Sequence, residues 1–357
     1  DDIARNIVLQ EFDGIIEPII LSWKNKDENG VTYNVDPIED HVEWLVSRSI
    51  NRAKLGEVPN SEKKVAVLYY NHGGGKNNFA AIYLDVPESL SNLVKAMNAS
   101  GYNTGTEPVP NETELLDLMV LQGRNVGTWA PGELESMVES GKVVLWPTDE
   151  YMKWFSTLPS EKQKEITDQW GPAPGDIMVY ENESGSYFVI PRIEFGNVIL
   201  GPQPTRGWEQ NEAAMYHNGS LAPHHQYLAY YLWLQHEYGA DAIVHFGTHG
   251  TQEWLPGKDV ALSRYDWPSV MVGDMPVIYP YIMDDVGEGI QAQRRGNAQI
   301  VDHLTSPIIE AGLYGGYENI SDYITQYNDV SISEAVKTEY RNLILQEYDE
   351  LDLVDAL

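Results

Sequence analysis

Short apolar runs with glycines close behind them constrain the fold of this chain most strongly. Residues 65–70 read Val-Ala-Val-Leu-Tyr-Tyr, and a glycine-rich stretch at 73–75 and a predicted helix from Pro87 to Ser100 follow. A second run, from Ala242 to Phe246, is followed directly by Gly247. A buried strand, a glycine-rich connection and a helix open a doubly wound unit with a parallel sheet. We therefore expect an α/β fold with Rossmann-like parallel sheet units and additional β-hairpin and helical segments.

The predicted elements divide the chain into four parts, which are a helical and hairpin lead-in, a Rossmann-like α/β unit, a second α/β unit and C-terminal helices. Their bounds are residues 1–62, 63–175, 176–317 and 318–357. In the lead-in, Asn29-Gly30 favours a hairpin turn, and Asp36-Pro37 favours the start of a helix that ends near Leu55. The second α/β unit is expected to contain a helix from Glu288 to Leu304. The C-terminal helices are expected to lead into a region missing from this sequence.

Composition disfavours or excludes several classes of site and partner. The chain carries 54 Asp and Glu against 23 Lys and Arg, a formal charge of −31, so nucleic acid is disfavoured as a partner. It has no Cys, which excludes disulfides and thiolate metal ligands. No apolar run approaches the ~20 residues of a membrane span. Because the chain starts at Asp1-Asp2 without a signal peptide or Met, we expect a cytoplasmic, internal piece of a longer protein.

The glycine-rich stretch does not match a nucleotide-binding loop. The run from Asn71 to Asn78 lacks the spacing G-x-x-x-x-G-K-[ST], because Asn77 follows Lys76. A nucleotide or other cofactor site is therefore not expected on this chain. We interpret the stretch as a strand-to-helix connection near a ligand, since doubly wound folds bind ligands at the carboxyl ends of strands.

The segment from Asp241 to Lys258 carries the strongest candidate site. In it, His245, His249 and Glu253 follow one another at intervals of four residues, with glycines between them. Two imidazoles and a carboxylate are a common ligand set for a borderline divalent metal. The glycines favour a strand end that runs into a loop, where catalytic groups are commonly held. The alternative is three unrelated polar residues around a turn.

Two further groups of residues are candidates for the same site. His224 and His225 lie in the first turn of a predicted helix, where the helix dipole favours neutral, ligand-competent imidazoles. The alternative for this pair is a capping or packing role. Basic residues are few in this acidic chain, and several flank these loops, which makes them candidates for the recognition of carboxylates. They are Arg206, Lys258, Arg264, Arg294 and Arg295.

Taken together, these motifs resemble the family of large chelatase subunits that comprises the cobaltochelatase and magnesium-chelatase H proteins. The stretches that carry the resemblance are His245-Phe-Gly-Thr-His-Gly-Thr-Gln-Glu-Trp-Leu-Pro-Gly-Lys258, Pro223-His-His225, Tyr279-Pro-Tyr-Ile-Met-Asp-Asp-Val-Gly-Glu-Gly289, Ala292-Gln-Arg-Arg295 and Val301-Asp-His-Leu-Thr-Ser-Pro307. Trp254-Leu255 is similar to the cobalt-type branch, and Thr248 is similar to archaeal relatives. The resemblance spans nearly the whole chain.

The resemblance implies an ATP-dependent chelatase that inserts a divalent metal, Co²⁺ or Mg²⁺, into a tetrapyrrole ring. It implies that ATP is hydrolysed on a partner, an AAA+ ATPase motor subunit, which works with an adaptor subunit. For the reaction, we interpret Glu253 as the base that removes pyrrole protons and His245 and His249 as groups that handle the metal, with His225 as a further ligand. Candidates for contact with the ring and its carboxylates are Lys258, Arg294, Arg295, Glu288, Trp254, Arg206 and His224.

Two other function classes stay open on the sequence. A stand-alone hydrolase with a His/His/Glu zinc site predicts one tightly bound zinc and activity without ATP or partners. A tetrapyrrole-binding sensor predicts ring binding without metal insertion when every partner is supplied.

Overall fold

The chain folds into two compact units, residues 1–304 and residues 305–357. The computed structural model describes residues 4–30, 33–71, 78–79, 81, 84–127, 130, 132–206, 219–247, 250–280, 286–302, 315–329 and 331–351. The larger unit holds all of the described strands. The boundaries expected after residues 62, 175 and 317 stay predictions.

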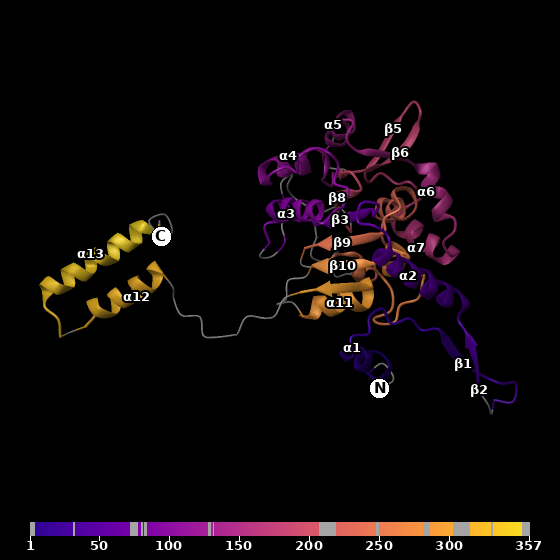
Figure 1. The fold of residues 1–357 in the computed structure, drawn as a ribbon, viewed down its shortest axis with the longest axis horizontal. Coiled ribbons are helices and arrows are strands. Elements are labelled where there is room, and N and C mark those ends of the chain that lie inside the picture. Colours follow the sequence, from indigo (N-terminus) through magenta and orange to yellow (C-terminus); the bar gives the residue numbers. More distant parts are fainter. Residues whose placement is uncertain are drawn as a thin grey trace. The chain divides into compact units, whose positions relative to one another are not determined.

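A six-stranded, mostly parallel sheet forms the centre of the larger unit (Figure 1). Its strands are β3 (Val65–Tyr69), β7 (Ile193–Phe195), β8 (Val198–Pro202), β9 (Ala242–Phe246), β10 (Val277–Pro280) and β11 (Ala298–Val301). Their order is β11-β10-β9-β3-β8-β7, and only β7 runs antiparallel to its neighbour. Counted along the chain, the five parallel strands lie in the order 2-1-3-4-5, which is that of the flavodoxin-like doubly wound sheet. The expected α/β fold class is confirmed.

Helices cover both faces of this sheet, as a parallel sheet requires. Ala66 and Leu68 of β3 pack with α9 (His225–Leu232) and α10 (Trp267–Val272) on one face. The alternate residues Val65, Val67 and Tyr69 pack with α3 (Val86–Ala99) and α4 (Glu112–Gln122) on the other. Since strand side chains alternate between faces, the apolar run at 65–69 supplies both halves of the core.

Two small antiparallel sheets accompany the central one. The first pairs β1 (Ser22–Lys26) with β2 (Tyr33–Pro37), and the second has the order β4 (Val144–Pro147), β6 (Gly185–Ile190), β5 (Val179–Asn182). The turn expected at Asn29-Gly30 is confirmed: Gly30 has a φ of +68° and donates its N–H to Asp27 O at 2.9 Å.

Two predicted elements are wrong in their bounds. Asp36 does not cap a helix but lies in β2 opposite Trp23, because a residue before proline prefers the extended conformation. The helix α2 instead spans Glu39–Glu57. The helix expected up to Leu304 is α11 (Val286–Gly296), and β11 follows it. Asn297 between them has a φ of +51°, which a continuing helix does not allow.

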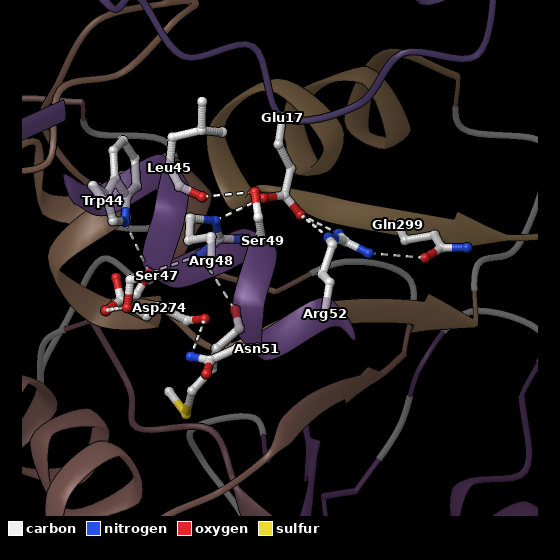
Figure 2. A network of polar contacts seen from close by, with 12 residues as sticks. Glu17, Trp44, Leu45, Ser47, Arg48, Ser49, Asn51, Arg52, Asp274 and Gln299 are labelled. Atoms are coloured by element: carbon white, nitrogen blue, oxygen red, sulfur yellow. Dashed lines mark hydrogen bonds and ion pairs between the residues drawn. The ribbon is translucent and has the colours of Figure 1, made fainter. Parts of the chain in front are cut away.

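A buried ionic network attaches α2 to the loop that precedes β10 (Figure 2). The Arg48 Nε donates to the Glu17 carboxylate at 2.6 Å, and its Nη1 donates to Gly273 O at 2.7 Å. Arg52 also pairs with Glu17. Burial alone would raise the pKa of Glu17, but the two guanidiniums lower it below its ordinary value. The ion pairs thus join α2 to Glu17 within the lead-in, and hydrogen bonds from Arg48 to Gly273 O and Met275 O hold the lead-in to the loop before β10.

The remaining helices are short, except for two in the smaller unit. Those of the larger unit are η1 (Ala4–Val8), α1 (Leu9–Phe12), α5 (Glu133–Glu139), α6 (Thr148–Phe155), α7 (Ser160–Trp170), η2 (Trp233–Tyr238) and η3 (Gln252–Trp254). The smaller unit is a helical hairpin of α12 (Gly316–Tyr327) and α13 (Glu334–Glu350), where Asn319 donates to Glu347 at 2.8 Å. Among the described helices, none combines the length and hydrophobicity that a membrane span requires.

Candidate functional site

The candidate site lies where the strand order of the sheet reverses. β3 has β8 on one side and β9 on the other, so the chain winds outward in both directions from β3. Open α/β sheets bind ligands outside the carboxyl ends of the strands at such a point. β3 leads into the glycine-rich stretch, and β9 is the first part of the histidine segment. Because β3 and β9 pair in parallel, the carboxyl ends of these two strands lie side by side. Residues 72–77 and 248–249 lie outside the described residues, and the prediction for His249 therefore stays untested.

His245 is the fourth residue of β9 and lies opposite Leu68 of β3. Its side chain is 2% exposed, and burial lowers the pKa of its imidazole to about 3. The ring stacks on Tyr279 with centroids 4.9 Å apart and on Tyr231 at 6.4 Å. Its Nε2 is buried without a hydrogen-bond partner. The site thus holds a neutral imidazole with one polar atom left unengaged.

Glu253 lies in η3, fully buried, and is held through its carboxylate. Gly250 N–H donates to Glu253 Oε1 at 3.0 Å, and the Tyr279 hydroxyl donates to the same carboxylate at 3.2 Å. A Cβ at Gly250 would lie within 2.6 Å of Gln252 Oε1 and 2.9 Å of His245 Nδ1, with Tyr279 Oη closer still. Only glycine fits at this position, where the loop approaches the histidine ring.

A shell of polar side chains connects these groups to the neighbouring strands and to α9. Gln203, just after β8, accepts from Thr251 N–H at 3.0 Å and donates to the Tyr231 hydroxyl at 2.7 Å. Tyr227 Oη lies 2.7 Å from Thr251 Oγ1. Burial raises the pKa of Tyr227, Tyr231 and Tyr279, so these phenols stay protonated as hydrogen-bond donors.

His224 and His225 use both of their ring nitrogens within the protein. His224 caps α9: its Nδ1 accepts from Tyr227 N–H at 3.1 Å, and its Nε2 lies 2.7 Å from Thr205 O. His225 Nδ1 lies 2.7 Å from Tyr151 Oη, and its Nε2 lies 3.1 Å from Gly171 O. Burial lowers the pKa of His224 to about 4 and also lowers that of His225. Both are neutral, as expected, but their geometry favours the capping and packing alternative over metal ligation.

The basic candidates differ in their burial and in the groups they contact. Arg206 is buried at the carboxyl end of β8 and donates to Leu221 O at 3.2 Å. Lys258 pairs with Asp266 at 2.9 Å, with over half of its side chain exposed. Arg294 pairs with Glu11 at 2.7 Å, and Arg295 is buried against backbone carbonyls. Arg206 also acts on Tyr227, because its charge lowers the pKa of that phenol against the larger effect of burial.

The other candidates flank the site. Trp254 is half-buried beside Glu253, and Glu288 is half-buried in the first turn of α11. Among the described residues, the one group of three ligand side chains close enough to share an ion is exposed, and it comprises Asp85, Glu88 and Glu112. His245 and Glu253 therefore form no three-ligand set with other described residues.

Three pockets formed by described residues do not reach the buried pair. They have volumes of about 580, 810 and 690 Å³, and neither His245 nor Glu253 lines them. Four stretches that follow strands of the central sheet, at 72–77, 207–218, 248–249 and 281–285, lie outside the described residues. Both His245 and Glu253 are buried.

Sequence reasoning missed Gln203, Tyr227, Tyr231 and Gln252 as parts of the site. Gln203 follows directly after an apolar strand, which is a signal that could have marked it. The tyrosines carry no local signal, because they come from a helix whose apolar residues cover nearly every face. Tyr279, the first residue of one of the stretches that carry the resemblance, is buried and stacked on His245.

Comparison with known proteins agrees with this fold and these motifs. The aerobic cobaltochelatase subunit CobN of Pseudomonas aeruginosa is 32% identical over 346 residues, covering 95% of this chain and 27% of that protein. The magnesium-chelatase H protein of Rhodobacter capsulatus is 31% identical over 331 residues, covering 88% of this chain and 26% of that protein. This chain thus spans little more than a quarter of the length of these relatives.

A solved structure and a family model extend the comparison to the whole chain. The catalytic subunit of cobaltochelatase from Mycobacterium tuberculosis has a TM-score of 0.76 and 30% identity, covering 99% of this chain and 29% of that subunit. The family model described as CobN/Magnesium Chelatase matches residues 1–357. The chain therefore belongs to the CobN/magnesium chelatase family.

Proposed function

We propose that this chain is the tetrapyrrole- and metal-handling part of the large subunit of an ATP-dependent chelatase, which inserts a divalent ion into a tetrapyrrole ring. The relatives named as parts of cobaltochelatase and magnesium chelatase support this reaction class. Trp254-Leu255 supports Co²⁺ as the favoured ion, with Mg²⁺ next. The sequence lacks the P-loop spacing, so ATP is assigned to an AAA+ motor subunit that acts with an adaptor subunit.

The observation that carries the proposal is the unengaged Nε2 of buried His245. Its pKa of about 3 keeps the imidazole neutral at physiological pH, so it can replace water on a divalent ion without first losing a proton. A buried polar atom without a partner costs about 1–3 kcal/mol. A residue with only a packing role would not need to carry that cost, because an apolar ring would fill the same stack between Tyr231 and Tyr279.

Glu253 is assigned the role of the base. Metal insertion releases two pyrrole protons, and a base must come within hydrogen-bond reach of them. The Glu253 carboxylate is held by Gly250 N–H and the Tyr279 hydroxyl. Because burial raises the pKa of Tyr279, that hydroxyl keeps its proton and orients the carboxylate instead of competing for the pyrrole proton. His249 is assigned to metal handling beside His245.

The ring and the ion must enter from outside, and the ring must bend for the ion to approach its nitrogens. Both His245 and Glu253 are buried, so entry requires a movement of the segments around them. That movement is assigned to the cycle of the motor subunit. This chain on its own is then expected to lack turnover, and insertion is expected only in the full-length subunit with its partners and ATP.

The test is Glu253→Gln in the full-length subunit, with motor subunit, adaptor subunit and ATP supplied. Insertion is followed by the absorbance of the metallated ring with Co²⁺ and with Mg²⁺. The expected result is a loss of about 100-fold or more with ring binding retained, the range for a general base. The matched control is Glu237→Gln, an exposed glutamate of η2, which is expected to leave insertion unchanged.

Three outcomes would contradict the proposal. Full activity of Glu253→Gln would remove Glu253 from the role of base. Ring binding without insertion by the wild-type protein, with all partners supplied, would favour the sensor. One tightly bound zinc per chain with hydrolytic activity in the absence of ATP would favour the hydrolase.

A further inference from the structure

Arg295 lies near the end of α11, and backbone carbonyls of the stretch 253–258 surround its guanidinium. Its Nε donates to Glu253 O at 2.7 Å, and its Nη1 donates to Gly257 O at 3.2 Å. Nη1 also donates to Lys258 O, and Nη2 donates to Leu255 O. The side chain is 5% exposed, and no described carboxylate forms an ion pair with it. Its donors are therefore committed to the stretch 253–258, and few remain for a substrate carboxylate.

This arrangement suits the shape of a guanidinium. Arginine presents five N–H donors in a rigid plane, whereas lysine presents a compact charge on a flexible stem. Burial lowers the pKa of Arg295, and the charges of Asp259, Asp266 and Glu253 act against that effect. Because the planar fork contacts four carbonyls along one short stretch, it fixes the path of that stretch in a way that a lysine cannot reproduce.

The stretch 253–258 includes Glu253. Residues of α11 donate hydrogen bonds to the backbone carbonyl of Glu253, whereas Gly250 N–H and the Tyr279 hydroxyl donate to its carboxylate. Gln291 of α11 adds a hydrogen bond to Glu253 O at 3.3 Å. At Gly296, a Cβ would lie 3.1 Å from Gln252 Nε2 and 3.7 Å from Glu253 Cβ, so the end of α11 packs directly on η3. The position of Glu253 therefore depends on the fit between η3 and α11.

We propose that Arg295 is a positioning residue that sets the place of the Glu253 carboxylate for proton removal; the proposal rests on the function proposed above. It replaces the expectation that Arg295 binds the carboxylates of the ring. A displacement of about 1 Å of a reacting group can cost about 100-fold in rate. Arg295 should then influence kcat through Glu253 and leave the affinity for the ring unchanged.

An exposed ion pair elsewhere in the larger unit supplies the control. Lys153 of α6 pairs with Glu150, and 66% of the Lys153 side chain is exposed. Arg295→Lys, Arg295→Met and Lys153→Met are compared in the full-length subunit with its partners, with kcat, KM for the ring and the pH profile of kcat measured for each. Both Arg295 variants are expected to lower kcat by about 10–100-fold with KM within about twofold. Lys153→Met is expected to leave both within about twofold, because an exposed ion pair contributes little.

The pH profile separates positioning from general loss of structure. A positive charge near a carboxylate lowers its pKa, so Arg295→Met is expected to move the acid limb of kcat to higher pH. Arg295→Lys keeps the positive charge, so the acid limb of its kcat profile is expected at nearly the same pH as in the wild type, while kcat itself falls.

The outcomes that overturn the proposal differ from those that overturn the function. If the wild-type enzyme inserts metal and Arg295→Lys keeps the wild-type kcat, the positioning role is wrong and the function stands. A raised KM with unchanged kcat would assign Arg295 to the ring carboxylates instead. Failure of Arg295→Lys to fold, judged by circular dichroism, would assign the residue to the fold alone. Absence of insertion by the wild-type complex would overturn the function itself.

Discussion

The start of α9 and the end of β9 both bury histidines, but they treat the ring nitrogens differently. At α9, each nitrogen of His224 and of His225 lies within hydrogen-bond distance of a protein group. At β9, His245 is equally buried and lies between Tyr231 and Tyr279, yet its Nε2 has no partner. All three imidazoles have a lowered pKa because of burial, so charge does not distinguish the two regions.

The difference separates a histidine that stabilises the fold from one suited to bind a ligand. His224 pairs with a backbone N–H at the N-terminus of α9, and both His224 and His225 pair with loop carbonyls. These hydrogen bonds stabilise the protein without any ligand. The unengaged Nε2 of His245 destabilises the folded state by about 1–3 kcal/mol until a ligand pairs with it. The two regions should therefore respond in opposite ways to the loss of an imidazole.

The largest effect is expected from His245→Phe, measured as metal insertion by the full-length subunit with its partners. Phenylalanine keeps a ring between Tyr231 and Tyr279 but removes the nitrogens, so insertion should fall by about 100-fold, the upper end for perturbed metal sites. Thermal unfolding of this chain should be unchanged or shifted upward, since an unpaired buried polar atom is removed. A clear loss of stability with normal insertion would break the comparison.

The second effect is expected from His224→Phe, measured by thermal unfolding. This change leaves Tyr227 N–H and Thr205 O without their partners. The loss of a helix cap and of a buried hydrogen bond together should cost about 2 kcal/mol. Insertion per folded molecule should change by less than about tenfold. Equal stability of the variant and the wild type would show that α9 does not depend on this cap.

The third effect concerns pH. Unfolded imidazoles titrate near pH 6.5, whereas the pKa of His224 is about 4 and that of His245 about 3 in the folded chain. The unfolded state therefore takes up protons first as the pH falls, and this part of the stability is constant above pH 6.5 and lost progressively below it. The melting temperature of His245→Phe should fall less between pH 7 and pH 4.5 than that of the wild type. Parallel curves for the two proteins would contradict the depressed pKa of His245.

The smallest effect is expected from Lys258→Met. Lys258 pairs with Asp266, but 57% of its side chain is exposed, and such pairs contribute about 0–1 kcal/mol. Thermal unfolding should therefore shift by no more than about 2 °C for a protein of this size. A weaker affinity for the ring in the full-length subunit would restore Lys258 as a ligand of the ring carboxylates, and an unchanged affinity would leave it as a surface pair.

The elements of this fold could largely be predicted because their signals are local. The apolar run at 65–69 and the capped helices α3 and α4 follow from neighbouring residues alone. β11 could not be predicted, because four residues after Gly296-Asn297 continue an apparent helical pattern and become a strand only beside β10. The strand order 2-1-3-4-5 is also a property of pairing between distant segments.

The candidate site, like the fold, could be predicted from the sequence only where its signals are local. Spacing located the segment that holds His245 and Glu253, and both lie close to the switch point of the sheet. The partners that give these residues their properties are separated from them in sequence: Gln203 by 48 residues from Thr251, and Arg295 by 42 residues from Glu253. The sequence suggested that Arg295, a basic residue in an acidic chain, binds the substrate. In the structure Arg295 instead contacts backbone carbonyls, and no sequence pattern marks such contacts.

The most direct test of the account is the nitrogen coordination of Co²⁺ in the full-length subunit with its motor subunit and ATP. X-ray absorption is compared for the wild type, His245→Phe and His236→Phe, where His236 is an exposed histidine stacked on Trp154. The account predicts that His245→Phe removes one imidazole from the cobalt environment and that His236→Phe changes nothing. An identical cobalt environment in the wild type and in His245→Phe would contradict it.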